Sequence, residues 1–123
     1  MRLDTIHHQG QRRAARLAAD GTTLELLGGP APLGLLPLME AAARGEAFPA
    51  VTDRVPLAGA RFDAPLPVPR RNLWCVGRNY HAHAKELLTS VFKDNSAKVD
   101  SWPIVFTKVP ETVVPTSSDV KLP

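Results

Sequence analysis

The prolines of this chain restrict its fold more than any other feature, because they are grouped and each group interrupts regular structure. The sequence of 123 residues contains 12 prolines, and four of them stand at positions 56, 65, 67 and 69. Proline lacks a backbone N–H and fixes φ, so it ends helices and is excluded from the centre of a sheet. Residues 55–72 are therefore predicted to form an extended connector between two units, residues 1–67 and residues 68–123.

The segment before this connector carries strand and turn signals. Residues 1–6 alternate apolar and polar side chains, and an Asp-Gly pair at 20–21 separates two further strand-like runs. This pattern is typical of a β-meander. Residues 35–48 contain good helix formers and a glycine at 45, where a helix can end. We therefore expect a β-rich N-terminal subdomain with one short helix.

Short apolar runs return after the connector. LWCVG at 73–77 and PIVFTKV at 103–109 are predicted to be strands, the first of them buried and ending in a glycine. TVVP at 112–115 and DVKLP at 119–123 are expected to be edge strands. Residues 81–90 are compatible with a helix, and the polar residues 92–101 are predicted to form a loop.

Composition and charge exclude several classes of protein. Hydrophobic residues make up 44% of the chain and charged residues 22%, which is typical of a globular protein. The net charge of +3 arises from scattered residues and does not favour a nucleic-acid interface. Cys75 is the single cysteine, so no internal disulfide can form. Without a span-length apolar run or a signal peptide, a cytoplasmic protein with no membrane partner is expected.

The stretch GRNYHAHAKELL, residues 77–88, is the strongest candidate for chemistry. On a strand, His81 and His83 would share a face and could contribute to a zinc site. On a helix, His83 and Glu86 are neighbours at i and i+3, and a carboxylate beside an imidazole can help to activate water. A His-Glu pair on a solvent-exposed helix is also common, so the spacing alone leaves all three readings open.

The order of the motifs adds a family resemblance. WCVGRNY, then HAKE (His83 to Glu86), then VFTKVP with Phe106, Lys108 and Pro110 resembles the fumarylacetoacetate hydrolase family. Its members carry a strand ending in CVG-x-NY, a short lid helix with a His-x-x-Glu dyad, and a strand F-x-K-P. The flanking segments are similar too, although Val109 separates Lys108 from the proline and the segment before Lys108 is long.

The resemblance implies an α+β fold in which the β-rich N-terminal subdomain precedes the start of a mixed β-roll core. It also implies a full-length homodimer that acts as a metal-dependent hydrolase, cleaving a carbon–carbon bond in a 2,4-diketo acid, either an acylpyruvate or a compound like fumarylacetoacetate. Isomerases and decarboxylases of oxo-dicarboxylic acids share the scaffold, so this chemistry is an alternative; a non-catalytic β-rich fragment or interaction module is another. The implied catalytic residues are His83, Glu86 and Lys108, and the implied substrate-binding residues are Arg78, Asn79 and Tyr80.

The resemblance further implies Mg²⁺ or Mn²⁺ held by a Glu-x-Glu pair and a later aspartate. Among residues 110–123 the only acids are Glu111 and Asp119, and neither lies in such a motif. We therefore assign no metal ligand within this chain and expect the ligands beyond residue 123, in a longer enzyme. Four residues are given no role in this chemistry: Cys75 and Trp74 are expected to pack in a core, and His7 and His8 stay unassigned.

Overall fold

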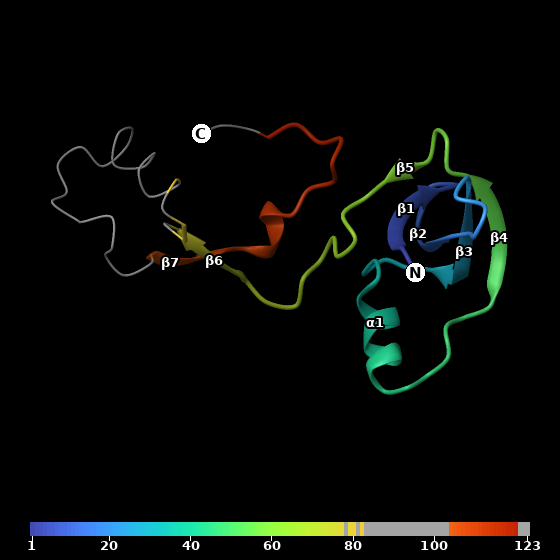
Figure 1. Cartoon of the computed structure of the whole chain (residues 1–123), viewed down its shortest axis with the longest axis horizontal. Helices are drawn as coiled ribbons and strands as arrows, with labels where there is room; N and C mark the ends of the chain where they lie inside the picture. The colour runs from blue at the N-terminus through green and yellow to red at the C-terminus, as the bar shows by residue number, and fades with distance from the viewer. Residues whose placement is uncertain (78, 81, 83–103, 121–123) are drawn as a thin grey trace, which may run out of the picture. The chain divides into compact units, whose positions relative to one another are not determined.

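A computed structural model of the chain describes residues 1–77, 79–80, 82 and 104–120 (Figure 1). The chain divides into two compact units, Met1–Arg70 together with Pro110–Pro123, and Arg71–Val109. Among the described residues, no helix has the length and apolar character needed to cross a lipid bilayer.

The first unit is built on a five-stranded antiparallel sheet with the strand order β4-β3-β2-β1-β5. Gln9 and Gly10 connect the first two strands and have φ of 49° and 76°, the left-handed values that a tight two-residue hairpin requires. Strands β1 to β4 pair in chain order, which confirms the predicted meander. The strands are β1 (Leu3–His8), β2 (Gln11–Leu17), β3 (Thr23–Pro30), β4 (Val51–Pro56) and β5 (Arg61–Phe62).

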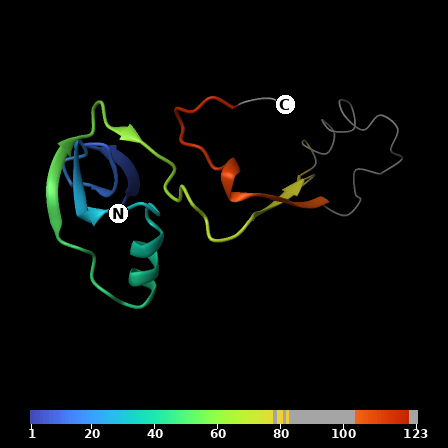
Figure 2. The same cartoon turned by 180° about the vertical axis from the view of Figure 1, so that it is seen from behind.

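Both faces of this sheet are covered by apolar packing. Successive residues of a strand point to opposite faces, so Ala15 and Leu26 enter one buried cluster while Ala14 and Leu27 enter another. The sheet curls around the first cluster, as Figures 1 and 2 show for β1 to β4. The curl places His8 Nε2 on β1 within 3.5 Å of Asp53 Oδ2 on β4, although two strands separate β1 from β4. We call the face around the first cluster the concave face.

The helix α1 (Leu36–Ala43) covers part of the opposite, convex face with Leu38, and Leu35 just before it joins the same cluster. Pro37 lies in its first turn, where a missing N–H costs nothing. Gly45 follows the helix with φ of 78°, a conformation that glycine adopts without strain. The predicted short helix ending near this glycine is confirmed.

The proline-rich connector contains no helix, as predicted, but it is not extended throughout. Residues 55–56 and 61–62 belong to β4 and β5, and the Ala60 N–H donates to the Leu57 carbonyl at 3.1 Å in a turn between them. The middle of the connector is fastened to the sheet. The Asp63 N–H donates to the Thr5 carbonyl at 2.9 Å, and the Thr5 hydroxyl donates to the Pro65 carbonyl at 2.9 Å. At Gly34, with φ of 64°, an added Cβ would lie 2.4 Å from Pro67 Cδ and 2.6 Å from the Pro65 oxygen. Residues 63–67 therefore pass so close to Gly34 that any residue with a Cβ atom at position 34 would clash with them.

The second unit contains two strands, β6 (Leu73–Gly77) and β7 (Ile104–Lys108), which pair antiparallel and which we call the β6–β7 ribbon. Both strands were predicted, but the predicted burial of β6 is wrong. Trp74 is 75% exposed and Val76 is 48% exposed. The physical reason is that the ribbon is a sheet of two strands in the described part of the chain, and two strands alone cannot bury a core.

The residues after the ribbon differ from the sequence prediction as well. Residues 112–115 do not form an edge strand, because Pro110–Thr112 is a 3₁₀ helix and the Val113 N–H donates to the Pro110 carbonyl at 3.0 Å. Proline lacks the donor for a sheet ladder and initiates turns, which outweighs the strand preference of the two valines. Residues 119 and 120 are not in a strand either, and the rest of the DVKLP segment lies outside the described residues.

Candidate functional site

Half of the six predicted site residues fall within the described part of the chain. Asn79, Tyr80 and Lys108 are described, whereas Arg78, His83 and Glu86 lie outside the described residues. The predicted lid helix and polar loop, residues 81–90 and 92–101, lie almost entirely outside them as well. The described part of the candidate site therefore consists of the β6–β7 ribbon with Asn79 and Tyr80 beyond it.

Asn79 and Tyr80 are two and three residues beyond Gly77, the end of β6, and are exposed, Tyr80 at 64%. Gly77 is the last residue of that strand and pairs with Ile104, the first residue of β7. Both side chains therefore leave the ribbon at this end, where an amide and a phenol could donate hydrogen bonds to a ligand.

Lys108 lies at the other end of the ribbon. It pairs with Leu73, the first residue of β6, four register positions from the Gly77–Ile104 pair. At about 3.3 Å per residue this separates the two ends by roughly 13 Å along the strands. The register thus places Lys108 and Gly77 at opposite ends of the ribbon.

The Lys108 ammonium is held against an aromatic ring of its own strand. Its Nζ lies 5.9 Å from the centroid of the Phe106 ring, because residues i and i+2 of a strand share a face. Lys108 is itself exposed, so its ammonium group stays in contact with water beside the ring. A positive charge at this position could stabilise negative charge on a carboxylate or an enolate oxygen.

Both faces of the ribbon are apolar and exposed. Phe106 is 42% exposed on the face of Lys108, and Val105 is 57% exposed on the opposite face. Trp74 shares the face of Val105, and its expected core packing is wrong in this structure. Cys75 is half-buried and lies on the face of Lys108. Within β6 and β7, Lys108 and the Cys75 thiol are therefore the two ionisable groups on this face.

The magnesium or manganese ion that the resemblance implies would need several oxygen ligands. No group of three or more His, Cys, Asp or Glu side chains in the described part of the chain is arranged to hold a metal ion. Glu111 and Asp119 are both exposed and lie on either side of a turn at Pro115. The described residues do not fit a magnesium or manganese site, and no catalytic step is derived through one.

The structure also reveals a polar cluster that the sequence did not indicate. The Asp63 side chain is 3% exposed and accepts hydrogen bonds from Arg12 Nε at 2.6 Å and from His7 Nε2 at 2.9 Å. Burial opposes ionisation of Asp63, but these hydrogen bonds and one from the Ala64 N–H hold its pKa below the usual value. His7, left unassigned from sequence, is thus part of the fastening of the connector.

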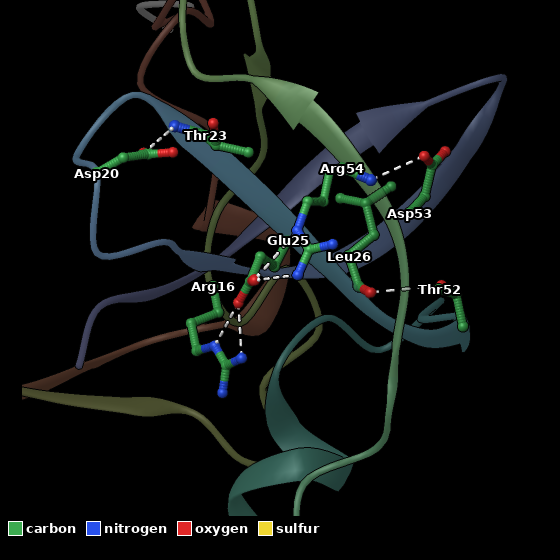
Figure 3. A network of polar contacts seen from close by, with 8 residues as sticks. All are labelled: Arg16, Asp20, Thr23, Glu25, Leu26, Thr52, Asp53 and Arg54. Atoms are coloured by element: carbon green, nitrogen blue, oxygen red, sulfur yellow. Dashed lines mark hydrogen bonds and ion pairs between the residues drawn. The ribbon is translucent and has the colours of Figure 1, made fainter.

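A second cluster crosses three strands (Figure 3). Glu25 on β3 accepts from Arg16 Nη2 on β2 at 2.6 Å and from Arg54 Nη2 on β4 at 2.9 Å. The two arginines, Arg16 before Arg54, lower the pKa of Glu25. These contacts cross-link neighbouring strands of the sheet, so we assign them to stability.

Comparison with known proteins gives one informative similarity. Oxaloacetate tautomerase YisK of Bacillus subtilis (strain 168) is 39% identical to the chain over 57 residues, which are 46% of this chain and 17% of that protein. The matched part is thus well under two thirds of the relative. No family model matches the chain. YisK is a member of the fumarylacetoacetate hydrolase family, so the similarity supports the family that the motifs indicate.

Proposed function

We propose that this chain contributes catalytic residues to an enzyme that interconverts forms of a 2-oxo dicarboxylic acid through an enolate, with oxaloacetate as the first candidate substrate. The observation that carries this proposal is the 39% identity to a protein named oxaloacetate tautomerase. The proposal selects the isomerase alternative of the family resemblance over carbon–carbon bond hydrolysis.

Tautomerisation needs a base and an acid but no attacking water, and a nearby cation can stabilise the enolate that forms. A proton leaves the carbon beside the carbonyl, the electron pair moves to the carbonyl oxygen, and a proton is returned to that oxygen. We assign the proton transfers to His83 and Glu86. Lys108, fixed against the Phe106 ring, supplies the positive charge that stabilises the enolate oxygen.

The register of the ribbon refines the substrate-binding assignment. Oxaloacetate is much shorter than the roughly 13 Å that four strand positions span. A single molecule could contact both ends of the ribbon only through extended side chains, which favours separate roles for Lys108 and Asn79. We propose that Lys108 contacts the substrate, and that Asn79 and Tyr80 orient the segment leading to His83. The divalent metal implied by the resemblance stays a prediction without a ligand in the described residues.

The test compares two reactions catalysed by a protein that contains this chain. The loss of the enol form of oxaloacetate is followed by ultraviolet absorbance, and cleavage of acetylpyruvate is followed in parallel. We expect accelerated ketonisation of oxaloacetate and weak cleavage. Cleavage without ketonisation would overturn the proposal in favour of the hydrolase reading.

Hydrolysis of a 2,4-diketo acid is the second candidate, because the motif order from WCVGRNY to VFTKVP is that of the hydrolases. In this reaction His83 and Glu86 would activate water for attack on the distal carbonyl. Replacement of Glu86 by glutamine distinguishes hydrolysis from ketonisation. It should abolish hydrolysis, whereas ketonisation that uses His83 as the base should be reduced less.

A further inference from the structure

The concave face of the five-stranded sheet opens at one end into a cavity of about 200 Å³. This is the end at which β1 and β3 begin and β2 and β4 finish. The apolar part of the walls comes from five different segments of the unit. It is formed by Leu3, Ala15, Leu17, Leu24, Leu57 and Phe62.

Two opposite charges line the same opening. Arg2 and Asp4 belong to the cavity lining and are two residues apart, so they project to the same face of the extended chain. The Arg2 carbonyl accepts from the Leu17 N–H at 3.0 Å, which continues the β1–β2 ladder and fixes the backbone there. The opening therefore combines an apolar interior with a cation and an anion at its edge.

No ion pair among the described residues includes Arg2 or Asp4, whereas Glu25 and Asp63 are both paired. Asp4 accepts a hydrogen bond from the Thr5 N–H at 2.9 Å, and partial burial raises its pKa. A half-buried carboxylate without a cation beside an apolar cavity costs stability, and a cationic ligand would relieve that cost.

We propose that this opening binds a free α-amino acid with an apolar side chain. The side chain occupies the cavity, the α-ammonium group pairs with Asp4, and the α-carboxylate pairs with Arg2. The cavity is smaller than the pockets of drug-sized ligands, which begin at about 300 Å³. It is large enough for one aliphatic or phenyl group, since an apolar cavity of about 150 Å³ can hold benzene.

Charge complementarity selects a zwitterion over simpler ligands. A carboxylic acid without an amino group would pair with Arg2 but would bring its negative charge near Asp4. An amine without a carboxylate would meet the converse problem at Arg2. A dianionic oxo acid fits this opening poorly, so the inference is independent of the enzymatic reaction proposed above.

The first experiment titrates the 123-residue chain with L-leucine, followed by calorimetry and by ¹H–¹⁵N NMR. The comparison ligands are 4-methylpentanoate, which lacks the amino group, 3-methylbutylamine, which lacks the carboxylate, and glycine, which lacks the side chain. We expect L-leucine to bind at least about tenfold more tightly than each. The first two ligands lose one charge-assisted hydrogen bond, and glycine loses the apolar contact with the cavity. The largest shift changes are expected at Leu17, Leu24 and Phe62.

Two variants test the roles of the edge charges. Asp4→Asn keeps an acceptor for the Thr5 N–H but removes the charge, so it should weaken L-leucine at least about tenfold and strengthen 4-methylpentanoate. Arg2→Gln should weaken L-leucine and 4-methylpentanoate alike. Glu46→Gln, in an exposed ion pair with Arg44, is the matched control and should bind as the wild type does.

Three results would overturn the inference. The first is an absence of shift changes at the cavity residues when L-leucine is present at millimolar concentration. The second is equal binding of glycine, which would show that the cavity is not occupied. The third is unchanged binding by Asp4→Asn, with circular dichroism confirming that this variant is folded.

Discussion

The five-stranded sheet and the β6–β7 ribbon are both antiparallel, yet they differ in what covers them. On the sheet, Leu26 and Ala15 are buried on the concave face, and Leu27 is buried on the convex face beneath α1. On the ribbon, Trp74 and Val105 are more than half exposed. The sheet has the apolar burial that stabilises a fold, and a two-stranded ribbon has little of it.

The two regions also differ in whether their charged residues have ion-pair partners. Several charged residues of the first unit are held in pairs, as Asp63 is by Arg12 and Glu25 is by Arg16. The ribbon carries Lys108 over a ring, and no ion pair of that lysine is found among the described residues. Because Lys108 has no ion-pair partner among the described residues, its ammonium group is available to bind a substrate.

The largest expected effect is the loss of a side chain from the covered sheet. Leu26 is 0% exposed, so Leu26→Ala should lower the free energy of unfolding by about 2–5 kcal/mol. Urea unfolding followed by circular dichroism measures this. A loss below about 1 kcal/mol would show that the concave cluster is not close-packed.

The next effect concerns the connector. Asp63→Ala removes the acceptor for Arg12 and His7 and should destabilise the first unit by about 1–3 kcal/mol. The same urea experiment measures it, with the exposed Asp119→Ala as the matched control. If both variants unfold at the same denaturant concentration, the cluster contributes nothing to fastening the connector.

A dependence on pH follows from the same residues. The folded-state pKa values of Asp63 and Glu25 lie below their usual values, so their contribution to stability is complete above the unfolded-state pKa. It is lost as the pH falls through the folded-state pKa, whereas the raised pKa of Asp4 acts in the opposite direction. Urea midpoints should therefore decrease from about pH 5 downward, and less steeply in Asp63→Asn. A rising midpoint would mean that the Asp4 contribution dominates.

The smallest effect is expected on the ribbon. Trp74 is 75% exposed, so Trp74→Ala should change the free energy of unfolding by no more than about 0.5 kcal/mol. Amide hydrogen exchange extends the comparison, because β6 amides should exchange far faster than those of β2 and β3. A large destabilisation by Trp74→Ala would show that the ribbon is covered in solution.

Local sequence signals were sufficient for much of the secondary structure. Alternation in residues 1–6 and the Asp-Gly turn predicted the first strands, and Gly45 marked the end of α1. The apolar runs predicted β6 and β7, but the same runs gave the wrong burial. Burial depends on which other elements lie against a strand, and a local pattern contains no such information.

The candidate site shows the same limit. His7 and Asp63 are 56 residues apart, and only the pairing of β5 with β1 brings them within 2.9 Å. The opposite positions of Lys108 and Asn79 likewise follow from strand register, which the motif order does not specify. The motif did place Lys108 on a strand, which the structure confirms.

The most direct test of the functional account is the rate of oxaloacetate ketonisation in a protein containing this chain, measured for two matched variants. Lys108→Met removes the ribbon cation and should lower kcat/KM by about 10²–10³-fold. Arg16→Met removes a paired cation from the sheet and should leave kcat/KM unchanged while lowering stability. Wild-type activity in Lys108→Met, or equal losses in both variants, would contradict the assignment of the chemistry to the ribbon.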